Sequence, residues 1–453
     1  MEWLSLLPPV VAIAVAIWKR EVIVALLAAL FVSETLLAGF NPGGGFTGML
    51  DRATAVFESP NSTRILMFSL LVGALLYYIQ YSGGVAAVVQ WLTRGGYTNN
   101  ARRAGLLPTF TGFAIFIETN MSILTSGIVA RGLFDRFRMS RARLAYIIDS
   151  TCAPVAILIL FNGWGAYLLG LIDEFQYENP VAVLAATIPL NFYALLTLAL
   201  VFYTVLTTRV HGPLKTAESK MDENQVDSDE IQPTRARYML LPVGTMIGGI
   251  LFFLWLTGDG SLLAGAGAQS VLWATALAVA VAYVLLRWDG VFEHRRLVEL
   301  GFQGMGKLLP VVATVLLALA LGASMRGLGT GEFVAAMLGP ALPVFLLAPL
   351  TFLAGAIISF TTGTSWGTYG ILIPIALPLA AAMDVPPSLI LAAVMGGGVF
   401  GDHCSPISDT TIISSLGAGC DHLEHVRTQI PYALVAGVLA LVGYALAGLM
   451  MGL

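Results

Sequence analysis

The sequence predicts an all-α polytopic membrane protein made of two inverted-topology repeats. Of its 453 residues, 57% are hydrophobic and 11% are charged, against about 25% charged in an ordinary soluble domain. A soluble chain of this size could not hide so much apolar surface, because much of its exterior must face water. The apolar residues also run in stretches of about 18 or more, which is the length that crosses a ~30 Å hydrocarbon core.

The hydrophobic segments predict the spans in chain order. They are residues 3–18, 21–39, 64–81, 105–130, 144–171, 180–208, 238–257, 269–286, 308–325, 344–383, 387–416 and 429–452. The first segment lacks a basic region before it and a small-residue cleavage site after it, so we expect a retained span and not a signal peptide. Three cysteines are too few, and odd in number, for a disulfide framework.

One long linker, residues 211–237, is strongly polar and lies between two hydrophobic arrays. A linker of this composition indicates the joint between two halves. The predicted domains are therefore a first repeat over 1–210, a cytoplasmic charged linker over 211–237 and a second repeat over 238–453.

The positions of lysine and arginine predict the orientation of the spans. Basic clusters flank segment 105–130 on both sides, and both can be cytoplasmic only if the segment enters and returns as a hairpin. Its polar middle, Glu118-Thr119-Asn120, suits the tip of such a hairpin. Segment 344–383 is too long for one span and is polar over 361–365, so we expect a second hairpin that opens to the outside.

With both hairpins in place, all but three of the 23 lysines and arginines lie on the cytoplasmic side, and both termini lie outside. Each half then has about five transmembrane helices and one re-entrant hairpin, and the two halves are inverted. Inverted repeats are a signature of secondary transporters, which switch access around a site near the midplane. The alternative is twelve plain spans with incidental polar residues, and it leaves arginines on the outer side.

A polar interruption follows each hairpin. Span 144–171 contains Asp149-Ser150-Thr151-Cys152-Ala153-Pro154, and span 387–416 contains Gly401-Asp402-His403-Cys404-Ser405-Pro406-Ile407-Ser408-Asp409-Thr410-Thr411. Both read Asp, then Cys-(Ala/Ser)-Pro, although Asp149 lies three residues before its cysteine and Asp402 two. Proline removes a backbone donor from a helix, so we expect both spans to be broken helices near the midplane.

Carboxylates without basic partners indicate the charge of the cargo. Glu118, Asp149, Asp402 and Asp409 lie at or near the predicted breaks, and no lysine or arginine does. An anion inside a bilayer must be protonated, bind a cation or be solvated in a cavity. Carboxylates, hydroxyls and freed carbonyls are the ligands of hard cations such as Na⁺. Competition between H⁺ and Na⁺ at Asp149, Asp402 or both would give antiport.

Other interpretations of these residues stay open. An acid can cap a half-helix without binding an ion, and His403 can relay protons or serve a structural role. We expect the cluster Asp421/His422/Glu424/His425 to be a solvated loop, with a pH sensor as the alternative. No ligand set completes a zinc site at Cys152 and Cys404.

Four stretches resemble a known family. They are Thr362-Gly363-Thr364-Ser365-Trp366-Gly367-Thr368, the run from Gly401 to Thr411, Gly417-Ala418-Gly419-Cys420-Asp421-His422 and, more weakly, Asp149-Ser150-Thr151. Together they resemble the NhaC-type sodium/proton antiporter family, over most of the chain outside the linker.

The resemblance implies Na⁺/H⁺ exchange across a bacterial or archaeal cytoplasmic membrane, with no cofactor. It also implies paired hairpins, elevator-like movement and a homodimer. The implied ion site contains Asp149 and Asp402, with hydroxyls or carbonyls at Asn120, Thr364, Ser365, Ser405 and Ser408.

Two other classes of function compete with antiport of Na⁺ and H⁺. A Na⁺- or H⁺-coupled transporter or exchanger of a small organic solute, such as an amino acid, remains the main alternative. An organic anion fits poorly, because no basic residue lies in the predicted core. No nucleophile–base motif or cofactor fingerprint suggests an enzyme, and no basic stripe suggests nucleic acid. The expected partners are the lipid bilayer, Na⁺ and H⁺.

Overall fold

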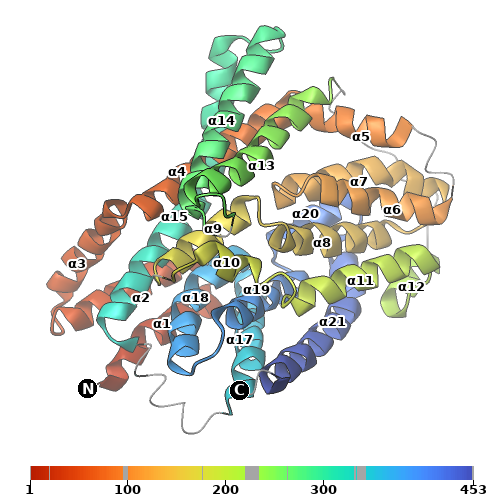
Figure 1. Ribbon diagram of the computed structural model, residues 1–453. Coiled ribbons are helices and arrows are strands. Elements are labelled where there is room, and N and C mark those ends of the chain that lie inside the picture. The colour runs from red at the N-terminus through yellow and green to blue at the C-terminus, as the bar shows by residue number, and fades with distance from the viewer. Residues whose placement is uncertain are drawn as a thin grey trace.

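The computed structural model describes residues 2–19, 21–94, 100–175, 177–219, 234–262, 264–330, 333 and 343–450. Over these residues the chain is helical, without a β-strand, which confirms the predicted all-α fold (Figure 1). Eight of the described helices are long and apolar enough to cross a membrane, and up to ten spans result if each bent helix pair is one span. The assignment of two inverted repeats stays a prediction.

The helices up to residue 219, which include one at the start of the linker, are given in two groups in chain order. The first group is η1 (Glu2–Leu6), α1 (Leu7–Lys19), α2 (Val22–Leu37), α3 (Pro42–Ala55), η2 (Val56–Glu58), α4 (Pro60–Tyr81) and α5 (Gly84–Arg94). The second group is α6 (Ala101–Ala114), α7 (Thr119–Arg136), α8 (Arg141–Leu158), α9 (Gly163–Asp173), α10 (Pro180–Ala185), α11 (Phe192–Thr207) and α12 (Gly212–Ser219). The expected span 180–208 is thus interrupted between α10 and α11.

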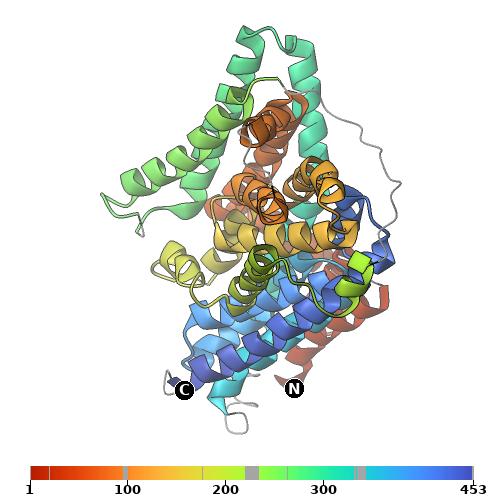
Figure 2. The ribbon, with the colours of Figure 1, turned by 90° about the vertical axis from the view of Figure 1, so that its right-hand side faces the viewer.

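The helices after the linker include the longest ones. They are α13 (Arg237–Thr257), α14 (Gly267–Trp288), α15 (His294–Gly327), η3 (Val344–Leu346), α17 (Leu347–Thr362), α18 (Ser365–Ala382), α19 (Pro387–Cys404), α20 (Asp409–Ala418) and α21 (His422–Met450). Helices α13 and α14 pack on each other and project from the rest of the molecule (Figures 1 and 2).

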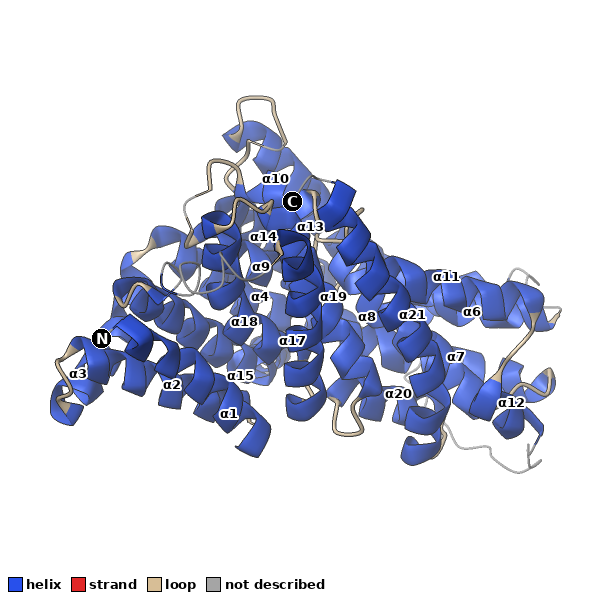
Figure 3. Cartoon of the chain, turned by 90° about the horizontal axis from the view of Figure 1, so that it is seen from below, coloured by secondary structure: helices blue, strands red, loops and turns tan. Residues whose placement is uncertain are grey.

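Two helix–turn–helix units lie where the sequence places the hairpins. Helices α6 and α7 pack together and are separated by residues 115–118. Helices α17 and α18 are separated by Gly363 and Thr364, and Gly363 ends α17 with φ +69°. A glycine adopts this left-handed conformation without the strain that a Cβ would cause. Figure 3 shows α17 and α18 beside α19, and α6 and α7 beside α8.

The break in the first half lies later than the sequence indicates. Helix α8 continues through Asp149 and Pro154, so the expectation of a broken helix at these residues is wrong. Every residue from Ala142 to Ile157 is buried, and protein packed around the helix lets it tolerate the donor that proline lacks. The bend of 44° between α8 and α9 occurs instead at residues 159–162.

Asn162 holds that bend together. Its side-chain nitrogen donates to the carbonyls of Ala156 (2.7 Å) and Ile159 (2.9 Å), at the end of α8. Its side-chain oxygen accepts from the backbone nitrogens of Trp164 and Gly165, at the start of α9. One amide therefore satisfies both helix ends, which otherwise would carry unpaired backbone groups at membrane depth.

The break in the second half lies where the sequence predicts it. Helix α19 ends at Cys404, residues 405–408 are non-helical, and α20 begins at Asp409 with Ser408 as its N-cap. The far end of α20 is held by arginines of the first half. Arg131 Nε donates to the Gly417 carbonyl (2.7 Å) and Arg141 Nη1 to the Ala418 carbonyl (2.8 Å).

The start of the linker is more ordered than its composition suggests. Residues 212–219 form α12, in which Leu214 is fully buried. Glu218 pairs with Arg143 of α8 at 3.1 Å and accepts from the Ser140 hydroxyl at 2.8 Å. Residues 220–233, which carry most of the predicted acidic loop, lie outside the described residues.

Candidate functional site

Two buried carboxylates lie at the centre of the site, one from each half of the chain. Asp149 lies in the middle of α8, and Asp402 lies in the last turn of α19, just before the break. Both side chains are 0% exposed. A carboxylate removed from water costs several kcal/mol unless hydrogen bonds or a cation compensate for it, so the partners of each carboxylate decide its role.

Asp402 is surrounded by hydroxyl groups. Ser408 Oγ donates to Oδ1 at 2.8 Å, and Thr410 Oγ1 donates to Oδ2 at 3.0 Å. Ser365 Oγ, from the tip between α17 and α18, lies 3.5 Å from Oδ2. The break after α19 makes this possible, because it turns the chain back so that the start of α20 faces the residue that precedes the break.

Asp149 has different partners. Gln429 Nε2 donates to its Oδ2 at 2.6 Å, and His425 Nε2 lies 3.3 Å from the same oxygen. Both come from α21, four residues apart and therefore on one helix face. The only ion pair that either central carboxylate forms in the described chain is the one between Asp149 and His425, and it is charged when the histidine is protonated.

Thr411 and Gln429 connect the two carboxylates. Thr411 Oγ1 lies 3.5 Å from Asp149 Oδ2 and 3.3 Å from the Asp402 carbonyl. Gln429 Nε2 also donates to the His403 carbonyl at 3.0 Å. His403 Nδ1 lies 2.9 Å from the Tyr193 hydroxyl. The two half-sites thus form one continuous polar cluster inside an apolar core.

Several buried polar atoms of this cluster have no partner in the described chain. They are Asp149 Oδ1, His403 Nε2, His425 Nδ1 and Gln429 Oε1. Each unpaired buried polar atom costs about 1–3 kcal/mol, so this cluster is energetically costly to hold inside the apolar core.

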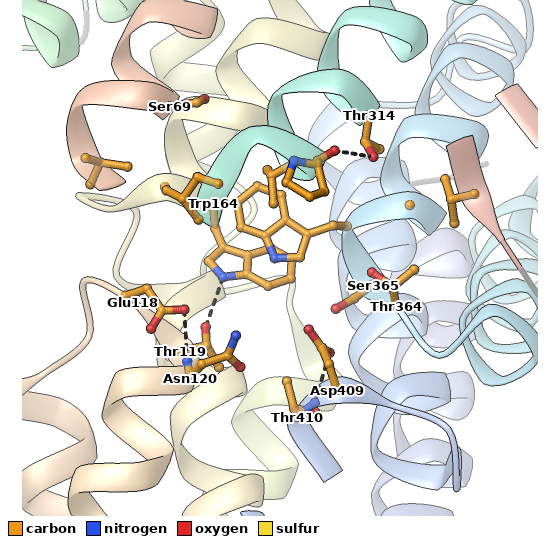
Figure 4. Close-up of a pocket in the computed structure, with 18 of the residues that line it drawn as sticks. Ser69, Glu118, Thr119, Asn120, Trp164, Thr314, Thr364, Ser365, Asp409 and Thr410 are labelled. Atoms are coloured by element: carbon orange, nitrogen blue, oxygen red, sulfur yellow. Dashed lines mark hydrogen bonds between the residues drawn. The ribbon is translucent and has the colours of Figure 1, made fainter. Parts of the chain in front are cut away.

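A cavity of about 310 Å³ adjoins the cluster. Residues of both helix–turn–helix tips line it, together with Asp409 and Thr410 at the start of α20. Figure 4 shows Glu118, Thr119 and Asn120 on one side and Thr364, Ser365 and Asp409 on the other. Ser365 and Thr410 both line the cavity and contact Asp402, so they connect that carboxylate to the open space.

Residues expected at the site divide into three sets. Ser365 and Ser408 contact Asp402. Asn120, Glu118, Thr364 and Asp409 line the cavity instead. Ser405 does not contact a central carboxylate, because its hydroxyl donates to the Phe360 carbonyl at 2.7 Å. Glu118 also caps α7, accepting from the backbone nitrogens of Asn120 and Met121.

Sequence reasoning missed Thr410, Thr411 and the pair on α21. The expectation that His425 lies in a solvated loop is wrong, because His425 is fully buried against Asp149. Asp421 and Glu424 of the same cluster are exposed, as expected. The available signal was the spacing of His425 and Gln429 in the first turns of a helix that is apolar after them. That spacing places two polar side chains on one helix face.

Comparisons with known proteins agree with this architecture. The model of the Na⁺/H⁺ antiporter family matches residues 155–449. A protein of Haemophilus influenzae with no assigned function is 31% identical, over 98% of this chain and 90% of its own length. The Na⁺/H⁺ antiporter NhaC of Alkalihalophilus pseudofirmus is 33% identical over 95 residues, 20% of this chain and 21% of that protein.

A solved structure shares the fold. The YdaH transporter of Alcanivorax borkumensis superposes with a TM-score of 0.61 at 16% identity, covering 90% of this chain and 88% of that one. The matched family and the NhaC relative are membrane transporters and not enzymes. The family match covers more than half of the sequence, and the predicted NhaC-type resemblance is confirmed. The chain belongs to the Na⁺/H⁺ antiporter family.

Proposed function

We propose that the protein exchanges Na⁺ for H⁺ by alternating access, with Asp402 and Asp149 as the groups for which the two ions compete. The observation that carries this proposal is the pair of fully buried carboxylates in one polar cluster, neither of which has a lysine or arginine partner in the described chain. A buried carboxylate that is charged and has no partner is costly, so each one needs either Na⁺ or H⁺ to neutralise it. Because one carboxylate carries one negative charge, binding of Na⁺ excludes H⁺, and binding of H⁺ excludes Na⁺.

The hydroxyls around Asp402 suit both occupants. When Asp402 is an anion without Na⁺, Ser408 and Thr410 donate hydrogen bonds to it. A hydroxyl can rotate and present its lone pairs instead, so the same groups, with Ser365, can bind Na⁺ beside the carboxylate. A proton on Asp402 replaces the charge of the ion. We propose that Asp149 is the second carboxylate at which Na⁺ and H⁺ compete.

The movement in this proposal is elevator-like. The helix–turn–helix units and the broken helices, α6–α9 and α17–α20, would carry the site past the remaining helices, together with α11 and α21, which contact His403 and Asp149. The docking of the C-terminal end of α20 on Arg131 and Arg141 supports movement of these elements as one unit.

Everted membrane vesicles test the exchange. In vesicles with an acidic interior, added Na⁺ should dissipate the pH gradient, and Asp402→Asn should reduce the rate at least tenfold. Asp421→Asn is the matched control, because Asp421 is exposed and the bond that it accepts from the backbone nitrogen of Glu424 can also be accepted by asparagine. The proposal fails if inserted protein gives no Na⁺ response over a wide pH range, or if Asp149→Asn and Asp402→Asn both retain full activity.

A second candidate is a Na⁺- or H⁺-coupled carrier of a small organic solute, such as an amino acid. The cavity favours it, since about 310 Å³ is far more than the roughly 10–15 Å³ that one water molecule needs by the same measure.

A further inference from the structure

The cavity between the two helix–turn–helix tips has a size and a lining that a bare ion does not use. A site for Na⁺ holds the ion between closely spaced oxygens. This cavity, at about 310 Å³, falls instead at the lower end of the range for small-molecule sites, roughly 300–1,000 Å³. Its walls include Phe68, Val72, Leu76 and Val311, which offer nothing to an inorganic ion.

The charge of the lining is negative. Three carboxylates, Glu21, Glu118 and Asp409, line the cavity, and no lysine or arginine is among the described residues that do so. Lys307 precedes the lining residue Leu308 and acts electrostatically on Glu118, but it does not line the cavity. The surplus of negative charge disfavours an anionic ligand.

The three carboxylates are not equivalent. Glu21 accepts from Val24 N at 2.7 Å, and both oxygens of Glu118 accept from backbone nitrogens of α7. These two acids therefore complete helix N-termini. The Asp409 carboxylate forms one hydrogen bond in the described chain, from Thr410 N to Oδ1 at 2.9 Å. Its Oδ2 remains for a ligand, and the side chain is exposed to the cavity (Figure 4).

Aromatic rings form another part of the wall. The indoles of Trp164 and Trp366 lie 4.3 Å apart between centroids, and Tyr167 stacks on Trp366 at 5.1 Å. Trp164 is fixed by a hydrogen bond from Nε1 to Thr119 Oγ1 at 3.1 Å. Trp366 is only partly buried. An indole attracts an organic cation that lies over the face of its ring, within about 6 Å of the centroid.

We propose that this cavity binds a small organic cation, an amine or a quaternary ammonium compound, with Asp409 as its counter-ion and Trp366 as its aromatic contact. The inference adds an organic ligand to the exchange of Na⁺ and H⁺ and rests on that proposed function for its coupling. Because Ser365 and Thr410 contact both the cavity and Asp402, a cation bound here acts on the groups that would hold Na⁺.

Binding to the purified full-length chain in detergent tests the proposal. The probes are choline and putrescine. Their neutral counterparts, 3,3-dimethylbutan-1-ol and butane-1,4-diol, have a similar shape without the charge. We expect at least one cation to stabilise the protein against heat, because a ligand of the folded state raises apparent stability. Its neutral counterpart should bind at least tenfold more weakly.

Two variants locate the site. Asp409→Asn should weaken binding of the cation about tenfold, which is about 1.4 kcal/mol, while Asp421→Asn leaves it unchanged. Trp366→Phe should remove most of the ligand-induced change in tryptophan fluorescence. Trp288→Phe is the matched control, because Trp288 ends α14 with 86% of its surface exposed.

Three results would overturn the proposal: equal binding of a cation and its neutral counterpart, stabilisation by Na⁺ but by neither organic cation, or an unchanged affinity in Asp409→Asn. The vesicle assay separates this failure from failure of the proposed function. Na⁺-driven dissipation of the pH gradient without organic-cation binding leaves the antiport and removes the organic ligand. Binding of an organic cation without Na⁺-driven dissipation of the pH gradient supports the organic ligand and removes the antiport.

Discussion

The two central carboxylates have partners of different chemistry, although similar motifs carry them. Asp402 contacts three hydroxyls, which can donate or accept, whereas Asp149 contacts one hydroxyl, that of Thr411 at 3.5 Å, together with an amide nitrogen, which can only donate, and a histidine. A group of rotating hydroxyls can serve a bound Na⁺, but the nitrogen of Gln429 cannot. This difference assigns the Na⁺ role in the proposed exchange to Asp402.

Ser408 and Ser405 test that assignment. Both were expected at the ion site, but only Ser408 contacts Asp402, while Ser405 bonds the Phe360 carbonyl. Ser408→Ala should raise the Na⁺ concentration for half-maximal dissipation of the pH gradient by about tenfold. Ser405→Ala should leave this concentration unchanged at matched protein amounts. Equal shifts in the two variants would contradict the assignment.

The sequence predicts the residues near Asp402 better than those near Asp149. Ser408 lies six residues after Asp402, so a local motif reveals both, although Thr410, two residues further on, was not predicted. His425 and Gln429 are 276 and 280 residues from Asp149 along the chain. Only the packing of α21 against α8 brings them together, and a single sequence carries no record of that contact.

At the scale of elements, a close helix crossing positions the start of α20. Gly127 of α7 lies against Gly417 of α20, and a Cβ on Gly127 would come within 2.4 Å of the Gly417 carbonyl carbon and oxygen. Small residues allow such backbone contact between membrane helices. Because Arg131 and Arg141 bond the same end of α20, the crossing fixes the helix whose first turn carries Thr410 and Thr411.

Gly127→Ala should therefore be destabilising by about 1–3 kcal/mol, the usual cost of overpacking, and should lower transport. Gly132→Ala on the same helix is the control, since a Cβ there would meet nothing within 4 Å. It should be neutral or slightly stabilising, because alanine favours helix more than glycine does. Thermal unfolding in detergent measures both, and equal melting temperatures would refute the role of the crossing.

The predicted elements differ from the structure where context overrides local signals. Proline at position 154 and the polar residues before it indicate a break, yet α8 is continuous because protein surrounds it on all sides. The bend lies instead at Asn162, which caps the start of α9 and donates a hydrogen bond to a carbonyl near the end of α8. After α19 the prediction succeeds, because Pro406 follows directly on Ser405 and α20 has its own N-cap at Ser408.

At the scale of the whole molecule, the helical fold and the pairing of polar interruptions follow from composition and hydrophobic spacing. The exchange proposed here also requires that one group of helices moves past another. In the elevator-like arrangement, α18 belongs to the moving group and α15 to the static one, and the two are in contact. A covalent link between them should hold the carrier in one state.

Cysteine pairs test this movement directly. A Cβ on Gly322 of α15 would lie 3.5 Å from Pro374 Cβ of α18, within the range of about 3.5–4.5 Å that disulfides adopt. Oxidation of a chain with Gly322→Cys and Pro374→Cys should stop Na⁺-driven dissipation of the pH gradient, and a reductant should restore it. Ser33→Cys with Ser324→Cys is the matched control, because these serines join α2 to α15 with hydroxyl oxygens 2.6 Å apart. Both helices belong to the static group, so this link should leave transport intact.

Transport that continues through a fully formed link between residues 322 and 374 would show that α18 does not move relative to α15. The elevator-like part of the proposal would then be abandoned. The competition of Na⁺ and H⁺ at Asp402 would still stand, because it does not depend on which helices move.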